Sequence, residues 1–314
     1  MKYVVTGGAG FIGSHIVGAL VKHGQEVVVI DDFSTGKQEN LNDLESKIKI
    51  VEGSIENLDL LQSLFKGVDF VLHQAALPSV PRSIKNPLRS NNVNITGTLN
   101  VLLAARDNGV KRLVYASSSS VYGNQEDHQY KVEDMNPCPL SPYALTKFAA
   151  EKYCQFFYEF YGLETVILRY FNVFGPRQDP NSEYSAVIPK FINAALQGEE
   201  VTVFGDGSQS RDFTYVENNV QANLLACKAP GEKVAGKVFN VACGATASLN
   251  ELIRVIEKIS GFSLKRQFFP PRVGDVKFSL ADIRRAQENL GYEVGINFEE
   301  GLKRTVAWYK ELLR

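Results

Sequence analysis

A tyrosine and a lysine four residues apart form the first pair of side chains that could do chemistry. Tyr143 and Lys147 lie in the stretch Ser141-Pro142-Tyr143-Ala144-Leu145-Thr146-Lys147, and this spacing places both on one face of a helix. A tyrosine with a pKa of about 10 is a weak base at neutral pH, but a nearby ammonium group favours its phenolate. The pair therefore predicts reversible removal of a proton from a substrate hydroxyl, the alternative being an ordinary helix-surface pair.

A run of serines precedes this pair in the chain. The predicted strand Arg112–Ala116 continues into Ser117-Ser118-Ser119-Ser120. In open α/β sheets, ligands bind at the carboxyl ends of the strands. A serine hydroxyl is therefore expected beside the tyrosine, with a simple serine-rich turn as the alternative.

Three glycines follow the first predicted strand directly. Gly7, Gly10 and Gly13 have the spacing GxxGxxG in Thr6-Gly7-Gly8-Ala9-Gly10-Phe11-Ile12-Gly13. A tight turn and a close approach to a pyrophosphate both require residues without Cβ, and the following helix directs its N–H groups at the phosphates. This pattern predicts a dinucleotide site, the alternative being a glycine-rich packing turn.

An aspartate after the second predicted strand indicates which dinucleotide is bound. Asp31 follows Glu26–Ile30 at the expected distance from the glycines. Its carboxylate can accept hydrogen bonds from a ribose diol, and it would repel the 2′-phosphate of NADP. We therefore expect NAD. Asp32 is adjacent and less well placed, and a solvated loop acid is the alternative for Asp31.

The order of the predicted elements defines the fold that must position these residues. Short β-branched runs alternate with helical patterns, which predicts a parallel sheet with helices on both faces. The strands are expected at Lys2–Thr6, Glu26–Ile30, Ile48–Glu52, Phe70–His73, Arg112–Ala116 and Thr165–Arg169. The helices are expected near Gly10–Lys22, Leu58–Phe65, Asn91–Asn108 and Tyr143–Tyr161.

The second half of the chain has a different pattern of secondary-structure elements. After about Asn172, prolines and glycines separate shorter elements, which predicts a smaller, partly helical lobe. A late strand at Lys237–Val241 is expected to return to the main sheet. We therefore expect a dinucleotide-binding domain at 1–171 with a returning segment near 213–242, and a substrate lobe formed by 172–212 and 243–314.

Composition excludes several classes of protein. The hydrophobic fraction of 44% and charged fraction of 22% are ordinary for a soluble globular protein. A net charge of −1 gives no strong field for nucleic acid or a membrane surface. The four cysteines form no CxxC pair, so no metal site is expected. No apolar run is long enough to span a membrane, and the chain runs straight from Met1 into the glycine motif, which favours a cytoplasmic protein.

Taken together, these motifs resemble those of the extended short-chain dehydrogenases/reductases that act on nucleotide sugars. The likeness covers almost the whole chain and includes the glycines, the aspartate, the serine run, the Tyr-Lys pair, Arg169-Tyr170-Phe171-Asn172 and Gly205-Asp206-Gly207. The resemblance implies a Rossmann-type, doubly wound parallel sheet with a smaller, partly helical C-terminal lobe for the substrate. It also implies a homodimer, in which the helices Asn91–Asn108 and Tyr143–Tyr161 form a four-helix bundle across the interface.

The resemblance extends to individual site residues. Ser118 corresponds to the catalytic hydroxyl, with Ser119 as the alternative, and acts with Tyr143 and Lys147. The cofactor residues it implies are Gly7, Gly10, Phe11, Ile12, Gly13, Asp31, Asp32, Ser54, Ile55, Ala75, Ala76, Asn92, Ser117, Tyr143, Lys147 and Tyr170. The substrate residues it implies are Ser79, Ser118, Ser119, Tyr143, Asn172, Val187, Arg211, Arg272, Asp275 and Ser279. One departure weakens the assignment of Ser54, because many relatives carry aspartate there.

Within this family, the residues after the catalytic serine discriminate between reactions. The 4,6-dehydratases carry Asp-Glu there, and decarboxylases carry a glutamate, whereas this chain has Ser119-Ser120. That difference favours a 4-epimerase, which needs only reversible oxidation at C4 of the sugar. The segments around His73, Ser79, Tyr170 and Gln178 are similar to those of UDP-N-acetylglucosamine 4-epimerases.

The residue Ser279 bears on the choice of sugar. It stands at the family's gatekeeper position, where a tyrosine restricts the pocket to UDP-glucose and UDP-galactose and a serine leaves room for a 2-acetamido group. We therefore expect interconversion of UDP-N-acetylglucosamine and UDP-N-acetylgalactosamine, together with UDP-glucose and UDP-galactose. The alternatives are a strict UDP-glucose 4-epimerase, a UDP-glucuronate 4-epimerase or another nucleotide-sugar enzyme, and a non-catalytic dinucleotide-binding protein.

Overall fold

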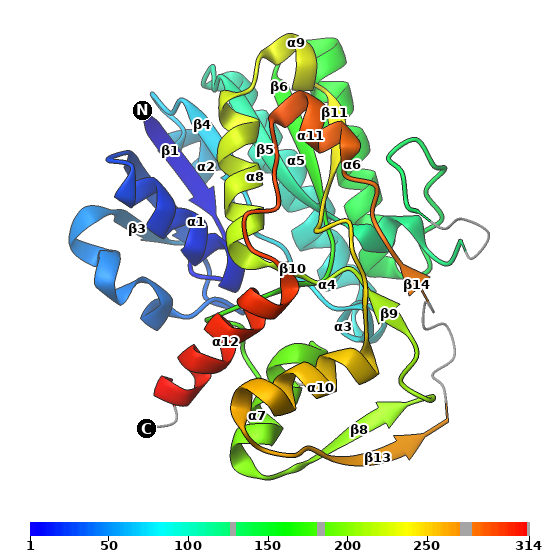
Figure 1. The fold of residues 1–314 in the computed structure, drawn as a ribbon. Coiled ribbons are helices and arrows are strands. Elements are labelled where there is room, and N and C mark those ends of the chain that lie inside the picture. The colour runs from blue at the N-terminus through cyan, green and yellow to red at the C-terminus, as the bar shows by residue number, and fades with distance from the viewer. Residues whose placement is uncertain (126–129, 181–185, 271–277, 313–314) are drawn as a thin grey trace.

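Seven parallel strands form one twisted sheet at the centre of the molecule (Figure 1). The computed structural model describes residues 1–125, 130–180, 186–270 and 278–312. The strand order is β11-β6-β5-β4-β1-β2-β3, and every neighbouring pair is parallel. The strands are β1 (Lys2–Thr6), β2 (Glu26–Asp31), β3 (Lys49–Glu52), β4 (Phe70–His73), β5 (Arg112–Ser118), β6 (Glu164–Tyr170) and β11 (Lys237–Val241).

Helices cover both faces of this sheet. One face packs against α1 (Phe11–Lys22), α8 (Val216–Lys228) and α11 (Arg284–Leu290). The other packs against α2 (Leu58–Leu64), α5 (Thr98–Asp107) and α6 (Pro142–Tyr161). Side chains of successive strand residues alternate between the two cores, so the β-branched runs are buried on both sides. The predicted fold class is confirmed, and β11 returns to the sheet beside β6 as expected.

The predicted helix Asn91–Asn108 is interrupted rather than continuous. It consists of α4 (Pro87–Asn91), a π-helical turn η2 (Asn92–Gly97) and α5. The amide of Asn94 accepts a hydrogen bond from Leu77 N–H at 2.8 Å and donates to Leu77 C=O at 3.2 Å. A wider turn of this kind is often found at functional sites, and here it presents a side chain to the loop after β4.

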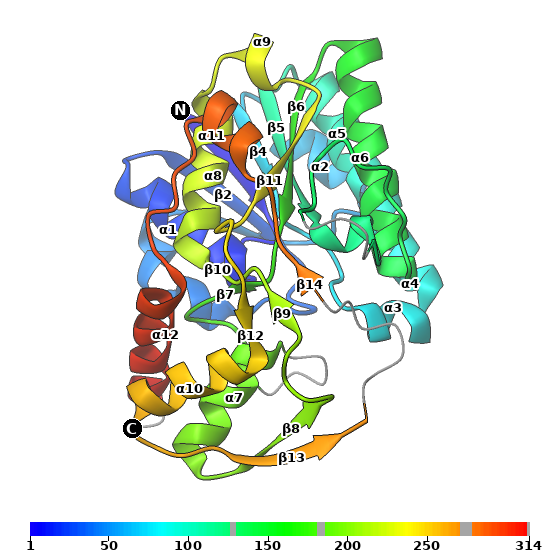
Figure 2. The same ribbon diagram turned by 45° about the vertical axis from the view of Figure 1, so that its right-hand side comes forward.

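A smaller lobe lies beyond the carboxyl edge of the sheet, as Figure 2 shows. Its core is formed by α7 (Val187–Gln197), α10 (Leu249–Ser260) and α12 (Phe298–Leu312). Strands β8 (Glu200–Phe204) and β13 (Lys265–Phe269) pair in parallel along its outer side. A second small sheet has the order β12 (Ala247–Ser248), β9 (Ser210–Arg211) and β14 (Phe278–Ser279), and β7 (Val173–Phe174) pairs with β10 (Thr214–Tyr215).

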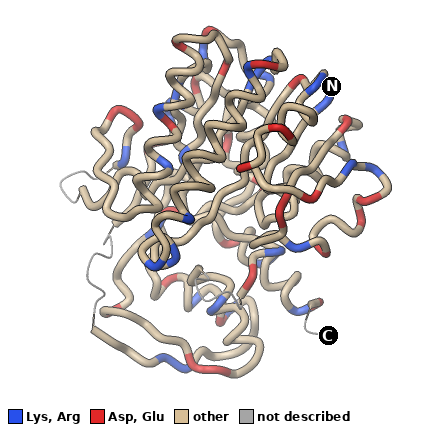
Figure 3. The backbone as a smooth tube through the Cα atoms, turned by 180° about the vertical axis from the view of Figure 1, so that it is seen from behind, with Lys and Arg blue, Asp and Glu red and all other residues tan. Residues whose placement is uncertain are grey.

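Short helices complete the described structure. They are η1 (Gln38–Lys47), α3 (Val80–Lys85), η3 (Ser119–Tyr122) and α9 (Gly231–Val234). Basic and acidic residues are interspersed along the backbone seen from behind in Figure 3. Across the described ranges, no helix combines the length and the apolar character needed to cross a membrane.

Candidate functional site

A cavity of about 420 Å³ opens at the carboxyl ends of β1, β2, β4, β5 and β6. Most of the predicted cofactor residues line it. They are Gly7, Gly10, Phe11, Ile12, Gly13, Asp31, Asp32, Ile55, Ala75, Ala76, Ser117, Tyr143, Lys147 and Tyr170. The structure therefore brings together, from segments far apart in the sequence, the residues expected to meet a dinucleotide.

The glycine turn leaves no room for larger residues. A Cβ on Gly13 would lie 2.1 Å from the carbonyl oxygen of Gly7, and Gly7 itself has φ of +67°. A Cβ on Gly7 would also lie 2.7 Å from the backbone of Ala75. The turn is thus packed tightly against the loop after β4, and the first turn of α1 presents its N–H groups to the cavity as an anion site.

Asp31 is held by backbone N–H groups of the glycine turn and of the loop after β2. Its Oδ2 accepts the N–H of Ala9 and its Oδ1 accepts the N–H of Phe33, both at 2.9 Å. The side chain is buried, and burial raises its pKa. Asp32 also lines the cavity, but its carboxylate accepts bonds from Ser34 N–H and Oγ–H. A fixed carboxylate next to the glycine turn suits the ribose diol of NAD.

Two predicted cofactor residues lie away from the cavity wall. The hydroxyl of Ser54 contacts its neighbour Glu56, whereas Ile55 lines the cavity. Asn92 is also outside the wall, and Val93 lines it instead. Asn94 in the same π-helical turn is bonded through its amide to the backbone of Leu77, which lines the cavity.

Tyr143 and Lys147 line one end of this cavity, and Ser118 ends the neighbouring strand β5. Tyr143 lies in the first turn of α6, and the Oγ of Ser118 accepts from Ser120 N–H at 3.2 Å. Burial raises the pKa of Tyr143, and the Ser118 hydroxyl opposes that rise. The N–H of Tyr143 donates to Ser83 Oγ at 3.0 Å, which joins the start of α6 to α3. Ser119 starts the short helix η3, one residue beyond Ser118.

Lys147 lies one helical turn after Tyr143 and is almost completely buried. Its Nζ donates to the carbonyl of Ala116 at 2.7 Å and lies 4.9 Å from the centre of the Tyr115 ring. Burial lowers its pKa to about 8, although the nearby Glu151 carboxylate favours the charged form. The ammonium therefore persists at neutral pH beside the reacting groups.

Two buried networks hold the strands that carry these residues. Glu151 accepts Ser117 Oγ–H at 2.5 Å and pairs with Arg169, whose Nη2 lies 2.7 Å from Oε2. The hydroxyl of Tyr170 accepts from Asn223 Nδ2 at 2.6 Å and donates to Gln74 at 3.2 Å. Both sets are fully buried or nearly so, which rigidifies the catalytic end of the cavity.

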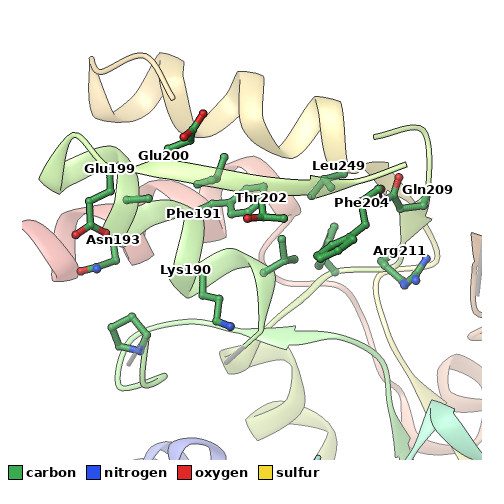
Figure 4. A pocket seen from close by; sticks show the side chains of 15 residues that line it. Lys190, Phe191, Asn193, Glu199, Glu200, Thr202, Phe204, Gln209, Arg211 and Leu249 are labelled. Carbon is green, nitrogen blue, oxygen red and sulfur yellow. Dashed lines mark hydrogen bonds between the residues drawn. The ribbon is translucent and has the colours of Figure 1, made fainter. Parts of the chain in front are cut away.

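A second cavity of about 580 Å³ lies in the smaller lobe (Figure 4). It is lined by α7, β8 and β9, including the predicted Val187 and Arg211. In Figure 4 the side chains of Lys190, Phe204 and Arg211 lie on the same side of β8. Two cations and an aromatic face suit a ligand with a base and phosphate groups.

The two cavities adjoin each other. Asp179 and Ala186 line the first, and their chain neighbours Pro180 and Val187 line the second. A ligand that extends from one cavity to the other would place its phosphates near Arg211 and its far end near Tyr143.

The remaining predicted substrate residues take different positions. Ser279 pairs with Arg211 across β14 and β9. Asn172 donates to the carbonyl of Asp212 at 3.3 Å. Ser79 caps α3, accepting from Arg82 N–H, with φ of 98° in the region that favours glycine. Arg272 and Asp275 lie outside the described residues.

Comparison with known proteins gives the family. Residues 3–242 match the model of the NAD dependent epimerase/dehydratase family. The chain belongs to this family. Its cofactor is NAD, and the prediction of an NAD-dependent nucleotide-sugar epimerase is confirmed at the level of the family.

Solved structures of three epimerases resemble the chain over nearly their whole length. The UDP-N-acetylglucosamine 4-epimerase of Methanobrevibacter ruminantium, in complex with UDP-N-acetylmuramic acid, is 43% identical with a TM-score of 0.94, over 99% of this chain and 98% of that one. The UDP-glucose 4-epimerase of Thermotoga maritima with UDP-glucose is 39% identical with a TM-score of 0.95, over 100% of both. The UDP-glucuronic acid 4-epimerase of Bacillus cereus, with UDP-glucuronic acid and NAD, is 35% identical with a TM-score of 0.91, over 99% and 100%.

Sequence reasoning missed several residues of the second cavity. Lys190, Phe191, Thr202, Phe204 and Gln209 all line it. Phe204 directly precedes Gly205-Asp206-Gly207, which is one of the motifs that carry the family resemblance. The signal for Lys190 is weaker, because a lysine on an amphipathic helix is usually a solvated surface residue.

Proposed function

We propose that this protein is a UDP-hexose 4-epimerase that interconverts UDP-N-acetylglucosamine and UDP-N-acetylgalactosamine, and also UDP-glucose and UDP-galactose. The observation that carries the proposal is the placement of Tyr143 and Lys147, one helical turn apart, on the wall of the NAD cavity, with Ser118 at the end of the adjacent strand β5. Tyr143 is the general base and acid for the sugar O4 hydroxyl. Ser118 donates to or accepts from the same oxygen, and Lys147 supplies a positive charge.

The chain's own residues move one proton in each half-reaction. NAD, held by the residues that line the first cavity, would supply a reversible hydride acceptor for C4 and a positive ring charge that favours the phenolate of Tyr143. Tyr143 takes the O4 proton as C4 is oxidised and returns it when the alcohol forms again. Lys147 stays protonated at neutral pH, because its pKa of about 8 is above that pH. The enzyme ends each turnover in the protonation state in which it began.

The second cavity is the proposed site of the uridine diphosphate. Phe204 offers an aromatic face to the base, and Arg211 offers a planar fork to the diphosphate. Anchoring the nucleotide there leaves the sugar at the junction of the two cavities. A 4-keto sugar can then turn over while its nucleotide stays fixed, which a 4-epimerase requires.

Ser279 supports acceptance of N-acetylated sugars. It lies next to Arg211 across the β9–β14 pair, and Arg211 lines the second cavity. A small side chain leaves volume for a 2-acetamido group, and a roomy pocket seldom rejects a smaller sugar. UDP-glucuronate is the competing substrate, because a relative of similar identity acts on it.

Product analysis tests the proposal. The purified protein is incubated separately with UDP-N-acetylglucosamine, UDP-glucose and UDP-glucuronate without added cofactor or acceptor. NMR and mass spectrometry are expected to show the C4 epimers of the first two at unchanged mass. If only UDP-glucuronate turns over, the sugar assignment is wrong. If none of the three is converted, the epimerase proposal fails.

A homodimer through α5 and α6 is part of this proposal. Leu145, Phe156 and Phe160 are 54%, 46% and 68% exposed along one side of α6. Their spacing of eleven and four residues keeps them on one helix face, and three exposed apolar side chains there indicate a protein contact. Light scattering tests it: the wild type should be a dimer and Phe160→Glu a monomer. A monomeric wild type would contradict the proposal.

A further inference from the structure

Asp212 is a completely buried carboxylate that follows strand β9 in the smaller lobe. Its oxygens are bonded to backbone N–H groups. Oδ1 accepts from Cys243 at 2.9 Å, and Oδ2 accepts from Gly244 at 2.9 Å and from Ala281 at 3.4 Å. The carboxylate therefore joins the loop after β11 to the segment after β14.

The backbone of Asp212 contacts the substrate residues directly. Its N–H donates to the carbonyl of Ser279 at 2.8 Å, and its carbonyl accepts from Asn172 Nδ2 at 3.3 Å. It also follows Arg211 in the chain. One residue is thus bonded to, or adjacent to, three residues that the family resemblance assigns to the substrate.

The surrounding strands are too short to hold these residues by themselves. β9, β12 and β14 contain two residues each, so each ladder supplies few hydrogen bonds. Arg211 pairs with Ala247 on one side and with Ser279 on the other. Hydrogen bonds to a charged acceptor are roughly twice as strong as neutral ones, so the Asp212 carboxylate strengthens the attachment of β9 to the loop after β11 and to the segment after β14.

We propose that Asp212 is a positioning residue of the substrate site. By fixing Ser279 relative to Arg211, it sets both the affinity for the uridine diphosphate and the discrimination between sugars with and without a 2-acetamido group. This inference rests on the proposed function and adds a residue that itself faces neither cavity. It also assigns the position of Ser279 to a carboxylate 67 residues away in the sequence.

The substitution Asp212→Asn tests the proposal with little change in volume. The amide replaces one acceptor oxygen with a donor, which then faces a backbone N–H and leaves it unsatisfied. Burial raises the pKa of Asp212 to about 6. Calorimetry is therefore done at a pH of about 7.5, where the native carboxylate is ionised. The Kd of UDP is expected to rise at least about tenfold, while that of NAD changes less than about twofold.

Glu133→Gln is the matched control. Glu133 is also a buried carboxylate, and it accepts a backbone N–H, that of Asn240 on β11, at 2.8 Å. It has no bond to Arg211, Asn172 or Ser279 among the hydrogen bonds of the described residues. Loss of the Glu133 carboxylate is expected to lower thermal stability but to leave the Kd of UDP within about twofold, since Glu133 holds a different part of the molecule.

Sugar selectivity is a second measurement, which should stay unchanged if Asp212 only stabilises the fold. The ratio of kcat/KM for UDP-N-acetylglucosamine to that for UDP-glucose is expected to change at least about threefold in Asp212→Asn. The same ratio should stay constant in Glu133→Gln. If Asp212→Asn does not fold, Asp212→Glu replaces it, because it keeps both acceptor oxygens on a longer side chain and should raise the Kd of UDP by a smaller factor.

The outcomes separate the two proposals. A folded Asp212 variant with native UDP affinity and native selectivity overturns the positioning role. So does a variant in which NAD affinity falls as far as UDP affinity, because the effect would then not be local to the substrate site. A wild-type protein that binds no UDP refutes the proposed function instead.

Discussion

The walls of the two cavities are built from very different lengths of backbone. Strands of five to seven residues, β1, β5 and β6, lead into the NAD cavity, whereas the second cavity is lined by the five-residue β8 and by β9, which has only two residues and pairs with the equally short β14. In the first case the strand register alone brings Ser118 beside Tyr170. In the second, Arg211 and Ser279 depend on side-chain bonds to the backbone.

This difference teaches where substitutions can change function without destroying it. The chemistry of C4 oxidation is fixed by the large sheet, which tolerates little change because it is buried on both faces. Recognition of the sugar depends on a few local bonds in the smaller lobe. Relatives that act on glucose, N-acetylglucosamine and glucuronate derivatives share the fold with TM-scores of 0.91 or more.

The largest expected effect separates chemistry from binding. Tyr143→Phe removes the group that carries the O4 proton, so the rate of epimerisation should fall by about 10²- to 10⁴-fold. Because the ring remains, NAD and UDP affinities should stay native in calorimetry. A Tyr143→Phe enzyme with wild-type turnover would show that another group is the base.

Gly13→Ala should damage the NAD cavity alone. Its Cβ would lie 2.1 Å from the carbonyl oxygen of Gly7, so the turn must open. We expect unfolding free energy to fall by about 1–3 kcal/mol, as in overpacked cores, with loss of measurable NAD binding. Gly18→Ala is the control on the same helix, since its nearest neighbour would be 3.8 Å away. It should raise stability by up to about 1 kcal/mol, and equal losses in both variants would contradict the close-packing argument.

Ser279→Tyr should change the selectivity for the sugar and leave the NAD cavity unchanged. A bulky ring at this position is expected to lower kcat/KM for UDP-N-acetylglucosamine by about 10- to 200-fold relative to UDP-glucose. NAD binding and the thermal midpoint should remain close to those of the wild type. Unchanged relative rates for the two sugars would mean that Ser279 does not face the 2-acetamido group.

A pH-dependent effect on stability follows from His73, which is buried and bonded to Thr6 just before the glycine turn. Thr98 Oγ donates to Asn94 C=O, so it accepts from His73 Nε2–H, and Nδ1 must accept from Thr6. Burial lowers the His73 pKa from 6.5 to about 3. The unfolded chain therefore binds one more proton below pH 6.5, and stability falls as pH is lowered from 6.5 towards 3, by about 1.4 kcal/mol per pH unit.

Denaturant unfolding of the wild type and His73→Gln over this pH range measures the effect. The variant should lose the His73 contribution to the slope, whatever its stability at neutral pH. Identical slopes in the wild type and His73→Gln would contradict the neutral, buried state of this histidine.

The large sheet was far easier to predict than the smaller lobe. The predicted bounds Lys2–Thr6, Phe70–His73 and Lys237–Val241 match the structure, because continuous β-branched runs are typical of strands buried on both faces. β5 extends two residues further than predicted, through Ser118, because its ladder with β6 continues. That extension is a property of strand pairing, and no local pattern of serines reveals it.

Site residues could be predicted where a sequence motif fixes the backbone, and less well where tertiary contacts determine the position of a side chain. The glycines, Asp31 and the Tyr143–Lys147 pair were found from type and spacing. The position of Asn92 outside the cavity wall depends on a π-helical turn that helical periodicity does not encode. The role of Asp212 depends on contacts with residues 31 to 69 positions away, which a single sequence cannot show.

The late return of β11 has a consequence for how the chain is made. During synthesis β6, with seven residues, remains an open edge until residues 237–241 have left the ribosome. Much of the smaller lobe, including α7 and β8, is produced in that interval. An open, apolar edge strand pairs readily with other chains. A product terminated before Lys237 is therefore expected to aggregate rather than to persist as a dinucleotide-binding fragment.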